Sequence, residues 1–133
     1  MKNRKLDGCS ILVVEDELLL LLLDMQKTFE DAGAKVVAAV GYDRALALAD
    51  TPGLNVAVID CSLAASNGWT LCAHLTQLGV PFVFCTGRDR DSVSAWSDAP
   101  FISKPAHPER LVDLVSSAFG RGPGHLQRAL TTT

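Results

Sequence analysis

The chain has 133 residues, which is long enough for a single domain with a buried core. With 48% hydrophobic residues and a net charge of −3, its composition argues against global disorder and offers no basic surface for nucleic acid or membrane lipid. The basic first residues are not followed by a signal-peptide core, and the apolar run Leu18–Leu23 is too short to cross a bilayer. We therefore expect a cytoplasmic protein that binds neither nucleic acid nor membranes.

Short apolar runs alternate with longer amphipathic segments, a pattern typical of βα units around a parallel sheet. Strands are expected at Ile11–Val14, Lys35–Val40, Val56–Ile59, Pro81–Cys85 and Phe101–Ser103. Helices are expected at Glu17–Ala32, Tyr42–Ala49, Gly68–Leu78 and His107–Phe119. Gly33 is predicted to end the first helix, and His107 to cap the last one.

Two segments are less regular. Residues 87–100 leave room for only a short or irregular fourth helix. Residues 120–133 contain a Gly-Pro-Gly sequence and end in three threonines, so we expect a mobile tail. The predicted organisation is an N-terminal extension over residues 1–9, a domain over residues 10–119 and a C-terminal tail over residues 120–133.

The four cysteines are scattered and form no C-x-x-C pair. In a cytosolic chain such cysteines are more often small buried hydrophobic residues than metal ligands or disulfide partners. This prediction covers Cys9, Cys61, Cys72 and Cys85.

Chemically active side chains stand where four of the expected strands end: Glu15, Asp16, Asp60, Thr86 and Lys104. In an open parallel sheet, ligands bind outside the carboxyl ends of the strands. Carboxylates gathered there repel one another unless a cation neutralises them, and oxygen ligands favour Mg²⁺. An aspartate beside the metal can accept a phosphoryl group, while an ammonium and a hydroxyl contact its oxygens.

In order and spacing, the motifs resemble the receiver domain of two-component response regulators over residues 10–119. The similar motifs are Val13-Val14-Glu15-Asp16-Glu17, Asp60 with Leu63 and Gly68, Thr86-Gly87, and Lys104-Pro105. The resemblance implies an α/β fold of the flavodoxin-like type, a doubly wound (βα)5 parallel sheet with strand order 2-1-3-4-5.

The resemblance also implies a role for each site residue. Asp60 would be phosphorylated. Mg²⁺ would be held by Glu15, Asp16, Asp60 and the backbone carbonyl of Ser62. The phosphoryl group would be contacted by Thr86, Lys104 and the backbone at Cys61 and Gly87, and the switch residues would be Thr86 and Phe101.

Some features depart from the family pattern. Eighteen positions separate Thr86 from Lys104, about one helical turn fewer than in many receivers, and Phe101 replaces the commoner tyrosine. Residues 81–87 are partly similar to the Phe-x-Thr-Gly signature of a stand-alone receiver subgroup common in alphaproteobacteria, but Arg88 departs from it.

The first expected helix carries leucines outside its apolar stripe. Leu20 and Leu23 fall among charged residues, and Leu19 falls at the boundary. Adjacent exposed leucines can form a docking surface, so we expect Leu19, Leu20 and Leu23 to meet a partner or a second copy of the chain.

We therefore expect a single-domain response regulator that receives its phosphoryl group from a histidine kinase or a phosphotransfer protein. It would not be an enzyme acting on an external metabolite, although it would catalyse its own phosphorylation and dephosphorylation. Alternatives within the fold are a phosphate sink or relay, and an adaptor that works without phosphorylation. A flavodoxin-like redox protein lacks support because no phosphate-cradling loop follows the first strand. A haloacid-dehalogenase-type phosphotransferase would need an aspartate where Ser62 stands.

Overall fold

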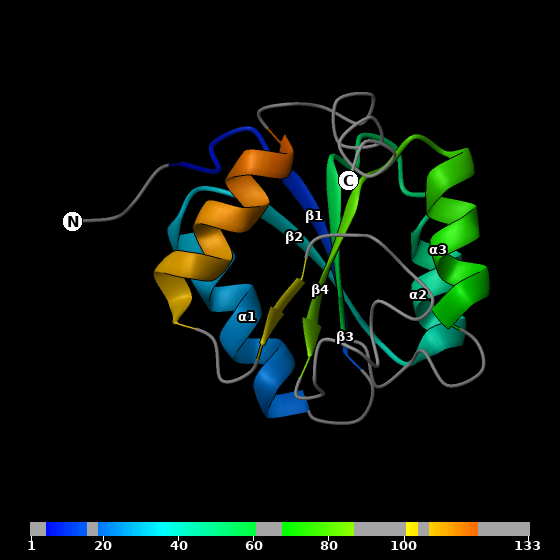
Figure 1. Ribbon diagram of the computed structural model, residues 1–133, viewed down its shortest axis with the longest axis horizontal. Helices are drawn as coiled ribbons and strands as arrows, with labels where there is room; N and C mark the ends of the chain where they lie inside the picture. Colours follow the sequence, from blue (N-terminus) through cyan, green and yellow to red (C-terminus); the bar gives the residue numbers. More distant parts are fainter. Residues whose placement is uncertain (1–4, 16–18, 61–67, 87–100, 104–106, 120–133) are drawn as a thin grey trace.

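The computed structural model describes residues 5–15, 19–60, 68–86, 101–103 and 107–119 (Figure 1). Five parallel strands form one sheet in the order β2-β1-β3-β4-β5, which confirms the predicted topology. They are β1 (Ser10–Glu15), β2 (Lys35–Val40), β3 (Val56–Asp60), β4 (Phe82–Thr86) and β5 (Phe101–Ser103). The predicted fourth helix and C-terminal tail lie outside the described residues.

Five strand ends differ from the predicted ones by one residue: both ends of β1, the end of β3, and both ends of β4. β1 and β3 extend to the polar residues Glu15 and Asp60, because backbone pairing continues after the apolar pattern has ended. β4 begins after Pro81, which has no N–H to donate. The Pro81 carbonyl still accepts a hydrogen bond from the N–H of Ala57, at 3.0 Å.

Helices cover both faces of the sheet (Figure 1). One face carries α1 (Leu19–Asp31) and a C-terminal helix over residues 108–119, and the other carries α2 (Tyr42–Leu48) and α3 (Gly68–Gln77). None of the helices in the described part of the chain is long and apolar enough to cross a membrane.

Alternating side chains of the strands divide the core into two clusters. Ile11 and Val13 of β1 belong to a cluster with α1 and helix 108–119, whereas Leu12 and Val14 belong to one with α2 and α3. This alternation follows from the two-residue period of a strand. All four residues are fully buried, so the central strand is apolar on both faces, as expected for a parallel sheet.

Glycines in the left-handed region end α1 and α3 in the same way. After α1, the N–H of Gly33 donates to the carbonyl of Glu30 and that of Ala34 to Phe29. After α3, the N–H groups of Gly79 and Val80 make the equivalent bonds, to Thr76 and Leu75. Both are Schellman motifs, in which glycine adopts a positive φ at little cost. The predicted stop at Gly33 is confirmed.

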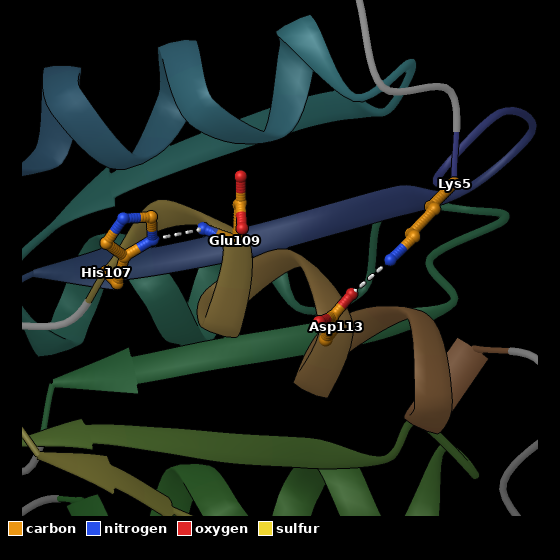
Figure 2. A network of polar contacts seen from close by, with 4 residues as sticks. All are labelled: Lys5, His107, Glu109 and Asp113. Carbon is orange, nitrogen blue, oxygen red and sulfur yellow. Dashed lines mark hydrogen bonds and ion pairs between the residues drawn. The ribbon is translucent and has the colours of Figure 1, made fainter.

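The C-terminal helix begins at a side-chain cap. The Nδ1 atom of His107 accepts a hydrogen bond from the backbone N–H of Glu109, at 3.3 Å (Figure 2). This bond satisfies one of the N–H groups that have no partner within the helix. The predicted cap is therefore confirmed.

The cysteines whose side chains are described behave as small hydrophobic residues. Cys9, Cys72 and Cys85 are buried and free of disulfides, as predicted, whereas Cys61 lies outside the described residues. Burial raises the pKa of the Cys9 thiol to about 12 from its ordinary 9.0. A thiol in this environment is not a reactive nucleophile at neutral pH.

The two helix-ending glycines allow a matched test of backbone strain. Gly79→Ala is expected to lower the free energy of unfolding by about 1 kcal/mol, because φ is positive there while an added Cβ meets open space. Gly33→Ala should cost more, because its Cβ would also overlap the carboxylate of Asp7. Urea unfolding measures both variants. Equal losses of unfolding free energy in the two variants would show that the contact with Asp7 does not affect stability.

The buried thiol of Cys9 predicts a loss of stability at alkaline pH. The folded protein keeps this proton to about pH 12, whereas the thiol of the unfolded chain ionises near pH 9. The stabilisation that comes from the buried neutral thiol is therefore complete below pH 9 and is lost as the pH rises toward 12. Relative to Cys9→Ala, the wild type should lose about 1.4 kcal/mol between about pH 8 and pH 10. Urea unfolding at both pH values gives the difference, and parallel pH profiles would contradict the prediction.

Candidate functional site

The carboxyl ends of the central strands meet at one edge of the sheet. Val14 of β1 is paired with Ile59 of β3, and the next residues along these strands are Glu15 and Asp60. Asp60 is in turn paired with Cys85 of β4, one residue before Thr86. The backbone therefore brings the ends that carry Glu15, Asp60 and Thr86 to neighbouring positions on adjacent strands, as the sequence predicted.

Glu15 is the buried acid of this edge. Its side chain is 1% exposed, and it is the only buried polar or charged residue among those whose side chains are described. A carboxylate is costly to bury unless hydrogen bonds, a countercharge or a metal ion compensates for the lost hydration. The burial of an acid at the end of an otherwise apolar strand therefore marks this edge of the sheet as a polar environment.

Gly41 fixes the loop beside this acid, and the sequence analysis did not identify it. Its N–H donates to the backbone carbonyl of Glu15 at 2.8 Å, and its own carbonyl accepts from Ala45 in the first turn of α2. Its φ is 89°, a conformation that glycine adopts without strain. The available signal was a glycine directly after a strand and before a helix.

The fifth strand supplies the remaining part of the edge. Phe101 is paired with Phe84, and Ser103 with Thr86, so β5 ends level with β4. Lys104 follows Ser103 directly in the sequence. The described part of β5 therefore ends beside Thr86.

The other predicted site residues are described by their backbone or lie outside the described residues. Asp60, Thr86 and Phe101 are described through their backbone, while Asp16, Cys61, Ser62, Gly87 and Lys104 lie outside the described residues. Their roles stay predictions. Among the side chains that are described, no group of three His, Cys, Asp or Glu residues is arranged to hold a metal ion.

The donor chemistry of the edge nevertheless fits Mg²⁺. The acids at the ends of β1 and β3 offer only oxygen ligands, which suit a hard cation. The cysteine paired with Asp60, Cys85, is buried at 2% exposure in the core cluster beneath α1. The residues present therefore fit magnesium better than a thiophilic metal.

The predicted docking leucines are described only in part. Leu23 is 49% exposed, the largest exposed fraction of any large hydrophobic side chain described. Leu19 and Leu20 lie in α1, but their side chains are outside the described part of the structure. Exposure of Leu23 agrees with a docking surface and does not identify what binds there.

Comparison with known proteins gives one family. The model of the response regulator receiver domain matches residues 11–116. No match was found among curated proteins.

The solved structures similar to this chain include response regulator receiver proteins from several organisms. A response regulator receiver protein from Sinorhizobium medicae WSM419 is 24% identical, with a TM-score of 0.74 over 84% of this chain and 94% of that chain. A CheY-like receiver domain protein from Methanospirillum hungatei JF-1 is 25% identical, with a TM-score of 0.71 over 85% of this chain and 94% of that chain. The chemotaxis response regulator CheY4 of Vibrio cholerae is 19% identical, with a TM-score of 0.72 over 83% of this chain and 98% of that chain.

Removing the buried acid tests the metal site. Mg²⁺ at ten times its Kd should stabilise the wild type by about 1.4 kcal/mol, measured by urea unfolding with and without the metal. Glu15→Gln should reduce this gain, because it removes one charged oxygen ligand from the predicted site. Glu109→Gln, an exposed acid on helix 108–119, is the control. A full gain in Glu15→Gln would exclude Glu15 from the site.

Proposed function

Because this chain belongs to the response regulator receiver domain family, we propose that it is a phosphorylation-controlled switch with Asp60 as its phosphoacceptor. One observation carries the proposal. Asp60 is the last residue of β3, between the strand that ends at the buried acid Glu15 and the strand that ends at Thr86. This is the edge at which a doubly wound sheet binds its ligands.

The proposed reaction is transfer of a phosphoryl group from a phosphohistidine. A carboxylate oxygen of Asp60 attacks the phosphorus atom, the phosphorus–nitrogen bond of the donor breaks, and its electron pair stays with the imidazole, which takes up a proton. The product is an acyl phosphate on Asp60. Hydrolysis of this bond by water returns the carboxylate and releases inorganic phosphate.

Receiver domains generally bind Mg²⁺ at the phosphorylation site, and the acids at this edge fit that ion. Glu15, Asp16, Asp60 and the backbone carbonyl of Ser62 would hold it. When bound, Mg²⁺ neutralises negative charge on the carboxylates and on the phosphoryl oxygens. The burial of Glu15 contributes to this arrangement, because charges interact more strongly where water is excluded.

The remaining residues act on the transferred group. The ammonium of Lys104 is a compact charge for one phosphoryl oxygen, and the hydroxyl of Thr86 donates to another. Backbone N–H groups at Cys61 and Gly87 complete the contacts. Since Thr86 ends β4 level with the end of β5, movement of its side chain toward the phosphoryl group would open space for Phe101.

The output of this switch is a change in protein binding. The donor is a histidine kinase or a phosphotransfer protein, in keeping with the family. The exposed Leu23 of α1 is part of the proposed docking surface, with Leu19 and Leu20. We place this switch in the cytoplasm and expect it to turn over no external metabolite.

Phosphorylation with a small donor tests the proposal. Acetyl phosphate with Mg²⁺ should add one phosphoryl group to the wild type, seen by intact mass, and none to Asp60→Asn. Asp43→Asn, an exposed acid in the first turn of α2, should be phosphorylated as the wild type is. Chelation of the metal should abolish the adduct. An adduct on Asp60→Asn, or none on the wild type, would exclude Asp60 as the phosphoacceptor.

A further inference from the structure

The residues before β1 are built into the domain at the end of the sheet opposite the candidate site. The N–H of Leu6 donates to the carbonyl of Ala32 after α1, at 2.9 Å. Cys9 closes a turn onto Leu6 through its N–H, and its carbonyl accepts from Lys35 at the start of β2. Residues 5–9 are therefore hydrogen-bonded to the segment that joins α1 and β2.

Leu6 anchors these residues in the core. Its side chain is fully buried, and it belongs to the cluster that contains Phe29 of α1 together with Leu111 and Val115 of helix 108–119. Complete burial of a leucine is among the larger single contributions to packing. The N-terminal residues thus share one core with the first and the last helices of the domain.

An ion pair joins the same residues to the outside of the C-terminal helix. The Nζ atom of Lys5 lies 2.5 Å from the Oδ1 atom of Asp113 (Figure 2). Both side chains are more than half exposed, so the pair is screened by water and is weak. Leu6 therefore provides most of the attachment, and the ion pair adds a weak contact with helix 108–119.

Residues 5–9 also lie close to the turn that ends α1, at Gly33. The carboxylate of Asp7 lies where a Cβ on Gly33 would be, so the chain passes directly over the turn that ends α1. Residues 5–9 are therefore held by hydrogen bonds, a buried side chain, an ion pair and a steric fit.

We propose that residues 5–9 form a clasp that controls local opening of helix 108–119. Release of the clasp exposes this helix and the last turn of α1 while the α2–α3 side of the sheet stays folded. The separation has a structural basis, because Leu6 and helix 108–119 belong to one core cluster and α2 and α3 to the other. The clasp does not depend on the chemistry proposed for Asp60. It would give the first residues of the chain control over a helix that begins four residues after Lys104.

Amide hydrogen exchange on the full chain tests the clasp, with α3 as the internal reference. Lys5→Ala and Asp113→Ala should each speed exchange in helix 108–119 by about two- to fivefold, the range for an exposed ion pair. The double variant should add little to either single change, since both remove the same contact. Leu6→Ala should speed exchange in this helix by at least about tenfold, because it removes the buried anchor.

Two matched variants serve as controls. Lys35→Ala removes an exposed lysine from the same end of the sheet, and Leu78→Ala removes a 45% exposed leucine after α3. Neither should change exchange in helix 108–119. Faster exchange confined to this helix and the last turn of α1 supports the clasp. Unchanged exchange in Lys5→Ala and Asp113→Ala, or equal acceleration in α3, overturns it.

Discussion

Parallel pairing of the central strands is the constraint on which the site depends. Val14, Ile59 and Phe84 lie side by side in β1, β3 and β4, so each strand reaches the same edge within one or two residues. A shift by one residue in any strand would turn its core side chains to the opposite face. Because the alternate side chains pack against different helices on the two faces, such a shift would disrupt both core clusters. The positions of Glu15 and Asp60 therefore follow from core packing.

The same packing divides the core into two clusters, one on each face of the sheet. The cluster under α2 and α3 supports the strand ends from one side, and the cluster under α1 and helix 108–119 includes the N-terminal residues. A disturbance in one cluster must pass through the sheet to reach the other.

The sequence predicted the parts of this structure that rest on local pattern. All five strands, the α1 stop at Gly33 and the cap at His107 were identified, because apolar runs, left-handed glycines and cap residues have short-range signatures. The predicted strands ended one residue before the polar ends of the observed ones, because the hydrophobic pattern does not show where backbone pairing continues. Gly41 was missed because its role depends on contact with Glu15, a residue far from it in sequence.

The clasp could not have been predicted from sequence in this way. Lys5 and Asp113 are 108 positions apart, and a segment of five residues has no periodicity that reveals burial of Leu6. The candidate site was predictable for a different reason. Its residues occupy strand ends, and the order of the strands in a doubly wound sheet brings those ends together.

Phosphorylation at this edge of the sheet is proposed to take place on Asp60. Reductive trapping tests it most directly, because borohydride converts an aspartyl phosphate to homoserine, which peptide sequencing by mass spectrometry then locates. After treatment with acetyl phosphate and Mg²⁺, the account predicts homoserine at position 60 and at no other aspartate. Homoserine at another position, or none in a sample that gains a phosphoryl group, would contradict it.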